Sequence, residues 1–103
     1  MNDRLGKLFN LLEKDKSDPF IHYAIALEYQ STQDLPKAIE YFDFIISNFP
    51  EYLPSYMQYG LLMQSLNNIE GAKKLFSDGI IKAKEQKDLH TQKELEEFLN
   101  DLD

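Results

Sequence analysis

The chain has 103 residues, 43% apolar and 28% charged, which suits one small domain that buries roughly 65% of its surface on folding. It contains no cysteine, which excludes disulfides, thiolate metal ligands and a cysteine nucleophile. Eleven basic and eighteen acidic residues give a net charge of −7, which argues against nucleic-acid binding because phosphate contacts need clustered Lys and Arg.

The first predicted element is an amphipathic helix within residues 1–16. Its apolar residues recur at helical spacing: Leu5, Leu8, Phe9, Leu11 and Leu12. This helix precedes the part of the chain that repeats. We expect it to be the second half of a further repeat unit, because Leu8 and Leu11 lie 34 residues before Phe42 and Ile45.

Residues 19–52 and 53–86 resemble each other at an offset of 34 residues. The alignment contains seven identical pairs, namely Leu27/Leu61, Gln30/Gln64, Ser31/Ser65, Ala38/Ala72, Phe42/Phe76, Ile46/Ile80 and Glu51/Glu85. Unrelated segments of this length would share about two pairs. The chain therefore contains two copies of one structural unit.

The first unit, 19–52, predicts two helices joined by a polar turn. Asp18 caps the first helix and Pro19 occupies its first turn. That helix should end near residues 31–33, with Glu28 facing solvent in its last turn. Asp34 caps the second helix, which Pro50 ends. The apolar residues are Ile21, Ala24, Ile25, Leu27 and Tyr29 in the first helix and Ile39, Phe42, Ile45, Ile46 and Phe49 in the second.

The second unit, 53–86, predicts the same pair of helices. Pro54 begins a helix that runs to about Leu66, and Asn67 and Asn68 form the turn. The next helix reaches about Gln86, and its inner residues are Leu75, Phe76, Ile80 and Ala83.

A capping helix is expected over residues 89–103, where the apolar residues are Leu95, Phe98, Leu99 and Leu102. Thr91 and Glu94 fit a capping box at its start. About six helices and no competing strand pattern predict an all-α, antiparallel helix-turn-helix stack that forms one domain over residues 1–103.

The 34-residue unit resembles the tetratricopeptide repeat family, which has a large residue, Leu-Gly, Tyr, Ala, Phe and Pro at fixed offsets. These positions hold His22, Ile25, Ala26, Tyr29, Ala38, Phe42 and Pro50 in the first unit and Tyr56, Tyr59, Gly60, Met63, Ala72, Phe76 and Lys84 in the second. Small residues let paired helices approach closely. Lys84 replaces the closing proline, so the helix that contains it should be longer than its counterpart.

This resemblance implies a right-handed superhelical stack and a non-enzymatic scaffold whose concave groove binds a partner protein or peptide. The groove positions of the family correspond here to ten uncharged residues: Phe20, Tyr23, Leu27, Gln30, Ser31, Pro54, Met57, Leu61, Gln64 and Ser65. The predicted binding residues among them are Phe20, Tyr23, Leu27, Gln30, Met57, Leu61 and Gln64. Some members of the family bind the C-terminal carboxylate of a partner through Lys, Asn and Arg at these positions. None of these residue types occurs there in this chain, so the resemblance does not imply a carboxylate-binding site. An apolar or amphipathic segment is the expected ligand. Self-association through the same face, as a homodimer, is the alternative.

No residue pattern indicates a catalytic, cofactor-binding or metal site. His22 and His90 are 68 residues apart without a second ligand at metal spacing, so we expect His22 to pack internally and His90 to lie on the surface. Glu94, Glu96 and Glu97 are expected to form a solvated helix face. The apolar runs are too short for a membrane span or a signal peptide, so a cytoplasmic protein is expected.

Overall fold

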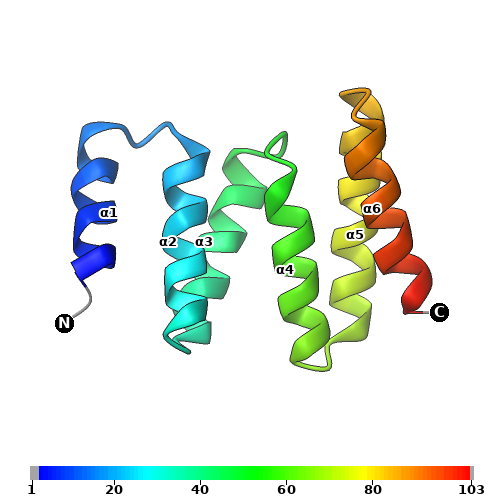
Figure 1. The fold of residues 1–103 in the computed structure, drawn as a ribbon, viewed down its shortest axis with the longest axis horizontal. Helices are drawn as coiled ribbons and strands as arrows, with labels where there is room; N and C mark the ends of the chain where they lie inside the picture. The colour runs from blue at the N-terminus through cyan, green and yellow to red at the C-terminus, as the bar shows by residue number, and fades with distance from the viewer. Residues whose placement is uncertain (1–2, 103) are drawn as a thin grey trace. The chain divides into compact units, whose positions relative to one another are not determined.

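The computed structural model describes residues 3–102, whereas Met1, Asn2 and Asp103, which end the predicted terminal helices, lie outside the described residues. The described part contains six α-helices and no strand, which confirms the all-α prediction (Figure 1). The helices are α1 (Asp3–Lys14), α2 (Pro19–Ser31), α3 (Leu35–Asn48), α4 (Pro54–Ser65), α5 (Ile69–Glu85) and α6 (Leu89–Asp101).

The chain divides into two compact units. Unit 1 is Met1–Phe49 and contains α1, α2 and α3, and unit 2 is Pro50–Asp103 and contains α4, α5 and α6. Each unit is built around one antiparallel helical hairpin (Figure 1).

The hairpin of unit 1 is formed by α2 and α3, and its helix ends follow the sequence signals. Asp18 accepts a hydrogen bond from the Phe20 amide at 2.9 Å, and Asp34 accepts one from the Lys37 amide at 3.3 Å. Gln33 adopts φ = 66°, a left-handed conformation that reverses the chain between the two helices. The predicted caps Asp18 and Asp34 are therefore confirmed.

The core of unit 1 joins the inner faces of α2 and α3. Its fully buried residues are Ile25, Ala26, Ala38, Phe42 and Ile45. Because Ala26 and Ala38 are small, the two helices can approach closely enough for Phe42 to fill the space beside them.

Helix α1 packs on α2, and its contacts correct two predictions. Glu28 was expected to face solvent, but its side chain is only 12% exposed and its Oε1 lies 3.4 Å from Arg4 Nη1. Leu11 was placed on the apolar face of the helix, but it is exposed, because it lies about 100° around the helix from Leu12. Phe9 packs as predicted, with its ring 6.5 Å from that of Tyr29.

The hairpin of unit 2 is formed by α4 and α5 and repeats the plan of unit 1. Asn67 adopts φ = 64°, and Asn68 caps α5 by accepting a hydrogen bond from the Gly71 amide at 3.0 Å. Helix α5 has 17 residues and α3 has 14, so the greater length predicted from Lys84 is confirmed.

Glycines allow α5 to pack closely against both of its neighbours in unit 2. A Cβ atom added at Gly60 would lie 2.4 Å from Phe76 Cε1. One added at Gly79 would lie 2.7 Å from Tyr56 Cβ and 2.9 Å from Leu95 Cδ1. Helix α4 therefore approaches Phe76 at Gly60, and α6 approaches α5 at Gly79.

Helix α6 begins earlier than its predicted capping box. Asp88 is the cap, since its carboxylate accepts hydrogen bonds from the Thr91 amide at 3.1 Å and the Thr91 hydroxyl at 2.8 Å. The prediction that Thr91 caps the helix was wrong, because Thr91 lies in the first turn, at the position whose free amide Asp88 satisfies. Leu95 is fully buried and Phe98 stacks on Phe76 with ring centroids 5.6 Å apart.

Candidate functional site

Four of the predicted site residues lie on α2 in unit 1. Phe20, Tyr23, Leu27 and Gln30 are spaced by three or four positions, which places them along one side of the helix. Phe20 is 59% exposed and the other three are half-buried. The Tyr23 ring lies edge-on to Phe42 at 6.4 Å, so the core orients one member of this face.

The other three predicted site residues lie on α4 in unit 2, again three or four positions apart. Met57 and Leu61 are half-buried and Gln64 is exposed. Each unit therefore carries an uncharged, mainly apolar helix side. We name these the α2 face (Phe20, Tyr23, Leu27 and Gln30) and the α4 face (Met57, Leu61 and Gln64).

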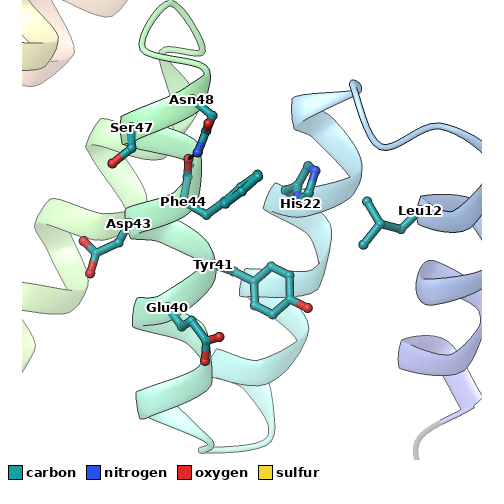
Figure 2. A pocket seen from close by; sticks show the side chains of 8 residues that line it. All are labelled: Leu12, His22, Glu40, Tyr41, Asp43, Phe44, Ser47 and Asn48. Carbon is teal, nitrogen blue, oxygen red and sulfur yellow. Dashed lines mark hydrogen bonds between the residues drawn. The ribbon is translucent and has the colours of Figure 1, made fainter.

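Unit 1 also contains a pocket that the sequence did not predict. It has a volume of about 520 Å³ and opens beside α3 (Figure 2). The lining residues come from all three helices of the unit: Leu12, His22, Glu40, Tyr41, Asp43, Phe44, Ser47 and Asn48.

An aromatic cluster forms the inner part of this pocket. The Phe44 ring points toward His22 in Figure 2, and their ring centroids are 4.7 Å apart. His22 is 5% exposed, which agrees with its predicted packing role, and its Nε2 lies 3.0 Å from the carbonyl oxygen of Lys16. This contact makes Nε2 the donor and leaves Nδ1 as a buried acceptor without a partner among the described residues.

The pocket also has a polar, acidic part. Glu40 and Asp43 contribute carboxylates, and the lining contains no Lys or Arg. Burial raises the pKa of the Tyr41 hydroxyl, and the neighbouring Tyr29 and Glu40 raise it further. The pocket thus combines partly dehydrated aromatic rings with negative charge.

The sequence contained a signal for this pocket. Glu40, Asp43, Phe44 and Ser47 recur at three- or four-residue spacing, which places them on one side of α3. Because Phe44 stands among these polar residues, the pattern indicates that this side of α3 is more than a polar surface in contact with water.

Groups that would support metal binding are not found in the described structure. Among residues 3–102, no cluster of three His, Asp or Glu side chains is suitably arranged to hold a metal ion. His90 lies on the surface as predicted, with its Nε2 3.3 Å from Glu94 Oε1. None of the helices described here is long and apolar enough to cross a membrane.

Comparison with solved structures shows which proteins share this fold. The solution structure of a tetratricopeptide repeat domain protein from Salinibacter ruber is 26% identical, with a TM-score of 0.82 over 86% of this chain and 90% of that chain. A crystal structure of a tetratricopeptide repeat domain protein from the same organism is 26% identical, with a TM-score of 0.77 over 84% and 96% of the two chains.

A solution structure of a protein from Bordetella parapertussis, 20% identical, shares the fold with a TM-score of 0.81 over 99% of this chain and 89% of that chain. No protein-family model matches the sequence, and no curated protein matches it either. The 34-residue period, the helical hairpins and these structural neighbours show that the chain has a tetratricopeptide-repeat-like fold.

Proposed function

We propose that the chain is a non-enzymatic protein-interaction module that binds an apolar or amphipathic segment of a partner protein. The binding residues in this proposal are those of the α2 face in unit 1 and of the α4 face in unit 2. The tetratricopeptide-repeat-like fold supports the general role, since such domains generally bind protein partners.

The observation that carries the proposal is the exposure of Phe20 on an uncharged helix side. Its phenyl ring is 59% exposed, and Tyr23 and Leu27 continue the same side of α2 toward its C-terminal end. An exposed aromatic ring that continues into aliphatic side chains is typical of a surface that a partner covers. Gln64 is exposed and ends the α4 face with an amide group that can bond to a partner's backbone, whereas the Gln30 Oε1 atom is buried.

The proposed mode of binding is burial of apolar side chains rather than ion pairing. Complete burial of one leucine contributes about 1.5–3 kcal/mol, which corresponds to roughly a 10- to 100-fold change in affinity. Such binding should change little between low and moderate salt, because screening acts on charges.

Two equivalent substitutions test the proposal in separate units. Leu27→Glu and Leu61→Glu each place a carboxylate on one face, and Ile81→Glu places one on α5 at a residue that is 55% exposed and outside both faces. A partner captured from the source cell by the unaltered protein should bind each of the first two variants at least about tenfold more weakly and Ile81→Glu equally well. Thermal unfolding checks that all three variants are folded.

The alternative, self-association through the same faces, is tested by light scattering after size exclusion over a range of concentrations. A monomer at all concentrations supports partner binding. A dimer that Leu27→Glu or Leu61→Glu dissociates replaces the proposal with the alternative. Unchanged partner binding by both glutamate variants contradicts either use of the faces.

A further inference from the structure

The pocket of unit 1 shares no residue with the α2 face or with the α4 face. Its volume of about 520 Å³ lies within the range of roughly 300–1,000 Å³ typical of ligand sites. The space is sufficient for one long side chain together with part of the backbone that carries it.

The aromatic side of the pocket offers an accessible ring face. Phe44 is 43% exposed although its ring centroid lies 4.7 Å from that of His22 and 6.2 Å from that of Phe49, so part of the side chain remains open to a ligand. Tyr41 lies next to the same cluster, with its ring 6.4 Å from His22. Aromatic rings attract cations to their faces, and a planar guanidinium can also stack on them.

The charged residue next to the aromatic ring indicates that the ligand is a cation. Glu40 is exposed and lies one helical turn before Phe44, so its carboxylate can reach a group bound on that ring. Its present partner is Lys37, whose Nζ lies 3.4 Å from Glu40 Oε2, and both side chains are more than half exposed. An exposed pair of this kind contributes little, so an incoming cation can compete for the carboxylate.

We propose that this pocket binds the guanidinium group of an arginine in a segment of a partner protein, stacked on Phe44 and paired with Glu40. The ligand is cationic because the exposed Glu40 carboxylate lies one helical turn from the Phe44 ring and the lining contains no Lys or Arg. Arginine fits better than lysine, because a planar guanidinium stacks on a ring and donates two parallel hydrogen bonds to one carboxylate.

The test uses the full chain labelled with ¹⁵N and a capped heptapeptide of Gly, Ser and Ala with one central arginine. Titration should shift the amide signals of residues 40–48 and of His22. The same peptide with citrulline keeps the shape and removes the charge, and it should bind at least about fivefold more weakly. The same peptide with a central lysine should bind with an affinity between those of the arginine and citrulline peptides.

Two variants test the named contacts, each with a matched control in unit 2. Phe44→Ala and Glu40→Gln should each weaken arginine-peptide binding about fivefold or more. Ile81→Ala and Glu97→Gln remove an exposed apolar side chain and an exposed carboxylate elsewhere, and they should leave binding unchanged. Because Phe44 and Glu40 are both exposed, the first two variants should unfold at nearly the wild-type temperature.

Three results would overturn the inference. Equal binding of the citrulline peptide would exclude charge recognition, and signal shifts outside the pocket, or none, would exclude the site. Equal binding of free Nα-acetylarginine amide would show that the site takes a small cation rather than a protein segment. Since the α2 and α4 faces are not involved, failure here leaves the proposed function intact, and loss of partner binding in Leu61→Glu leaves this site intact.

Discussion

Substitution of Gly60 by alanine should destabilise the protein, although alanine is the better helix former. Gly60 lies within α4, and the added methyl group would be 2.4 Å from Phe76 Cε1 and 2.8 Å from its Cδ1. Ordinary contacts between carbon atoms lie at about 3.5–4.0 Å, so the ring and the helix must separate by roughly 1 Å.

The size of the effect follows from the lack of space around Phe76. Its ring is fully buried and stacks on Phe98 with the ring centroids 5.6 Å apart, so it cannot move away freely. Forcing a methyl group into a packed core costs about 1–3 kcal/mol, whereas Gly→Ala in a helix gains about 1 kcal/mol. The difference is about 0–2 kcal/mol, and because Phe76 cannot move away freely we expect the upper half of this range, a net loss of about 1–2 kcal/mol and a Tm lower by roughly 4–16 °C.

Gly6→Ala provides the matched control, because Gly6 is also in a helix but a Cβ added there meets nothing within 4 Å. It should raise the free energy of unfolding by about 0.5–1 kcal/mol. Both variants are compared by urea and thermal unfolding monitored by circular dichroism. In a Phe76→Leu background, Gly60→Ala should be less destabilising, because the clashing ring is absent. A Gly60→Ala variant as stable as Gly6→Ala would refute the reasoning.

Three further changes test helix ends and one buried hydrogen bond. Lys87→Gly should raise the free energy of unfolding by about 0.5–1 kcal/mol in thermal unfolding, because Lys87 has φ = 59°; a lower Tm would contradict this. The amide and hydroxyl of Thr91 hold the pKa of Asp88 below its usual value, so its stabilising effect is present above about pH 4 and is lost as pH falls further. Tm should therefore fall more steeply below pH 4 in the wild type than in Asp88→Asn, and parallel curves would refute the assignment. Tyr56→Phe should lose about 1 kcal/mol in urea unfolding, because its hydroxyl donates to the Pro50 carbonyl oxygen at 2.7 Å, whereas an unchanged midpoint would show that this bond contributes nothing.

The sequence predicted the helices well because their ends have local physical causes. Pro19 and Pro54 begin helices where a missing amide hydrogen does no harm, and Asp34 satisfies an amide that would otherwise have no partner. The 34-residue period then related one hairpin to the other. The same period relates Gln33 and Asn67, the left-handed turn residues of the two hairpins, although only asparagine is a recognised turn former.

Features that depend on contacts between helices were predicted less well. The exposure of Glu28 depends on where α1 packs, and a helical pattern within α2 alone contains no information on this. Thr91 was predicted to cap the last helix from its local pattern, but Asp88 is the cap, and Leu95 of this helix packs against α5.

The candidate sites also divide into one that local sequence positions predicted and one that depends on contacts between helices. The α2 and α4 faces were predicted from repeat positions, and the structure shows how exposed Phe20 and Leu61 are within their own units. The pocket requires Leu12, His22 and Phe44 from three different helices, so only the folded unit reveals it.

The central claim, that apolar helix faces bind a partner segment, is tested most directly by methyl NMR of the complex with a captured partner. The account predicts that the methyl signals of Leu27, Met57 and Leu61 shift or broaden on binding, whereas that of the exposed Ile81 on α5 does not. Changes at Ile81 with none at Leu27, Met57 or Leu61 would contradict it.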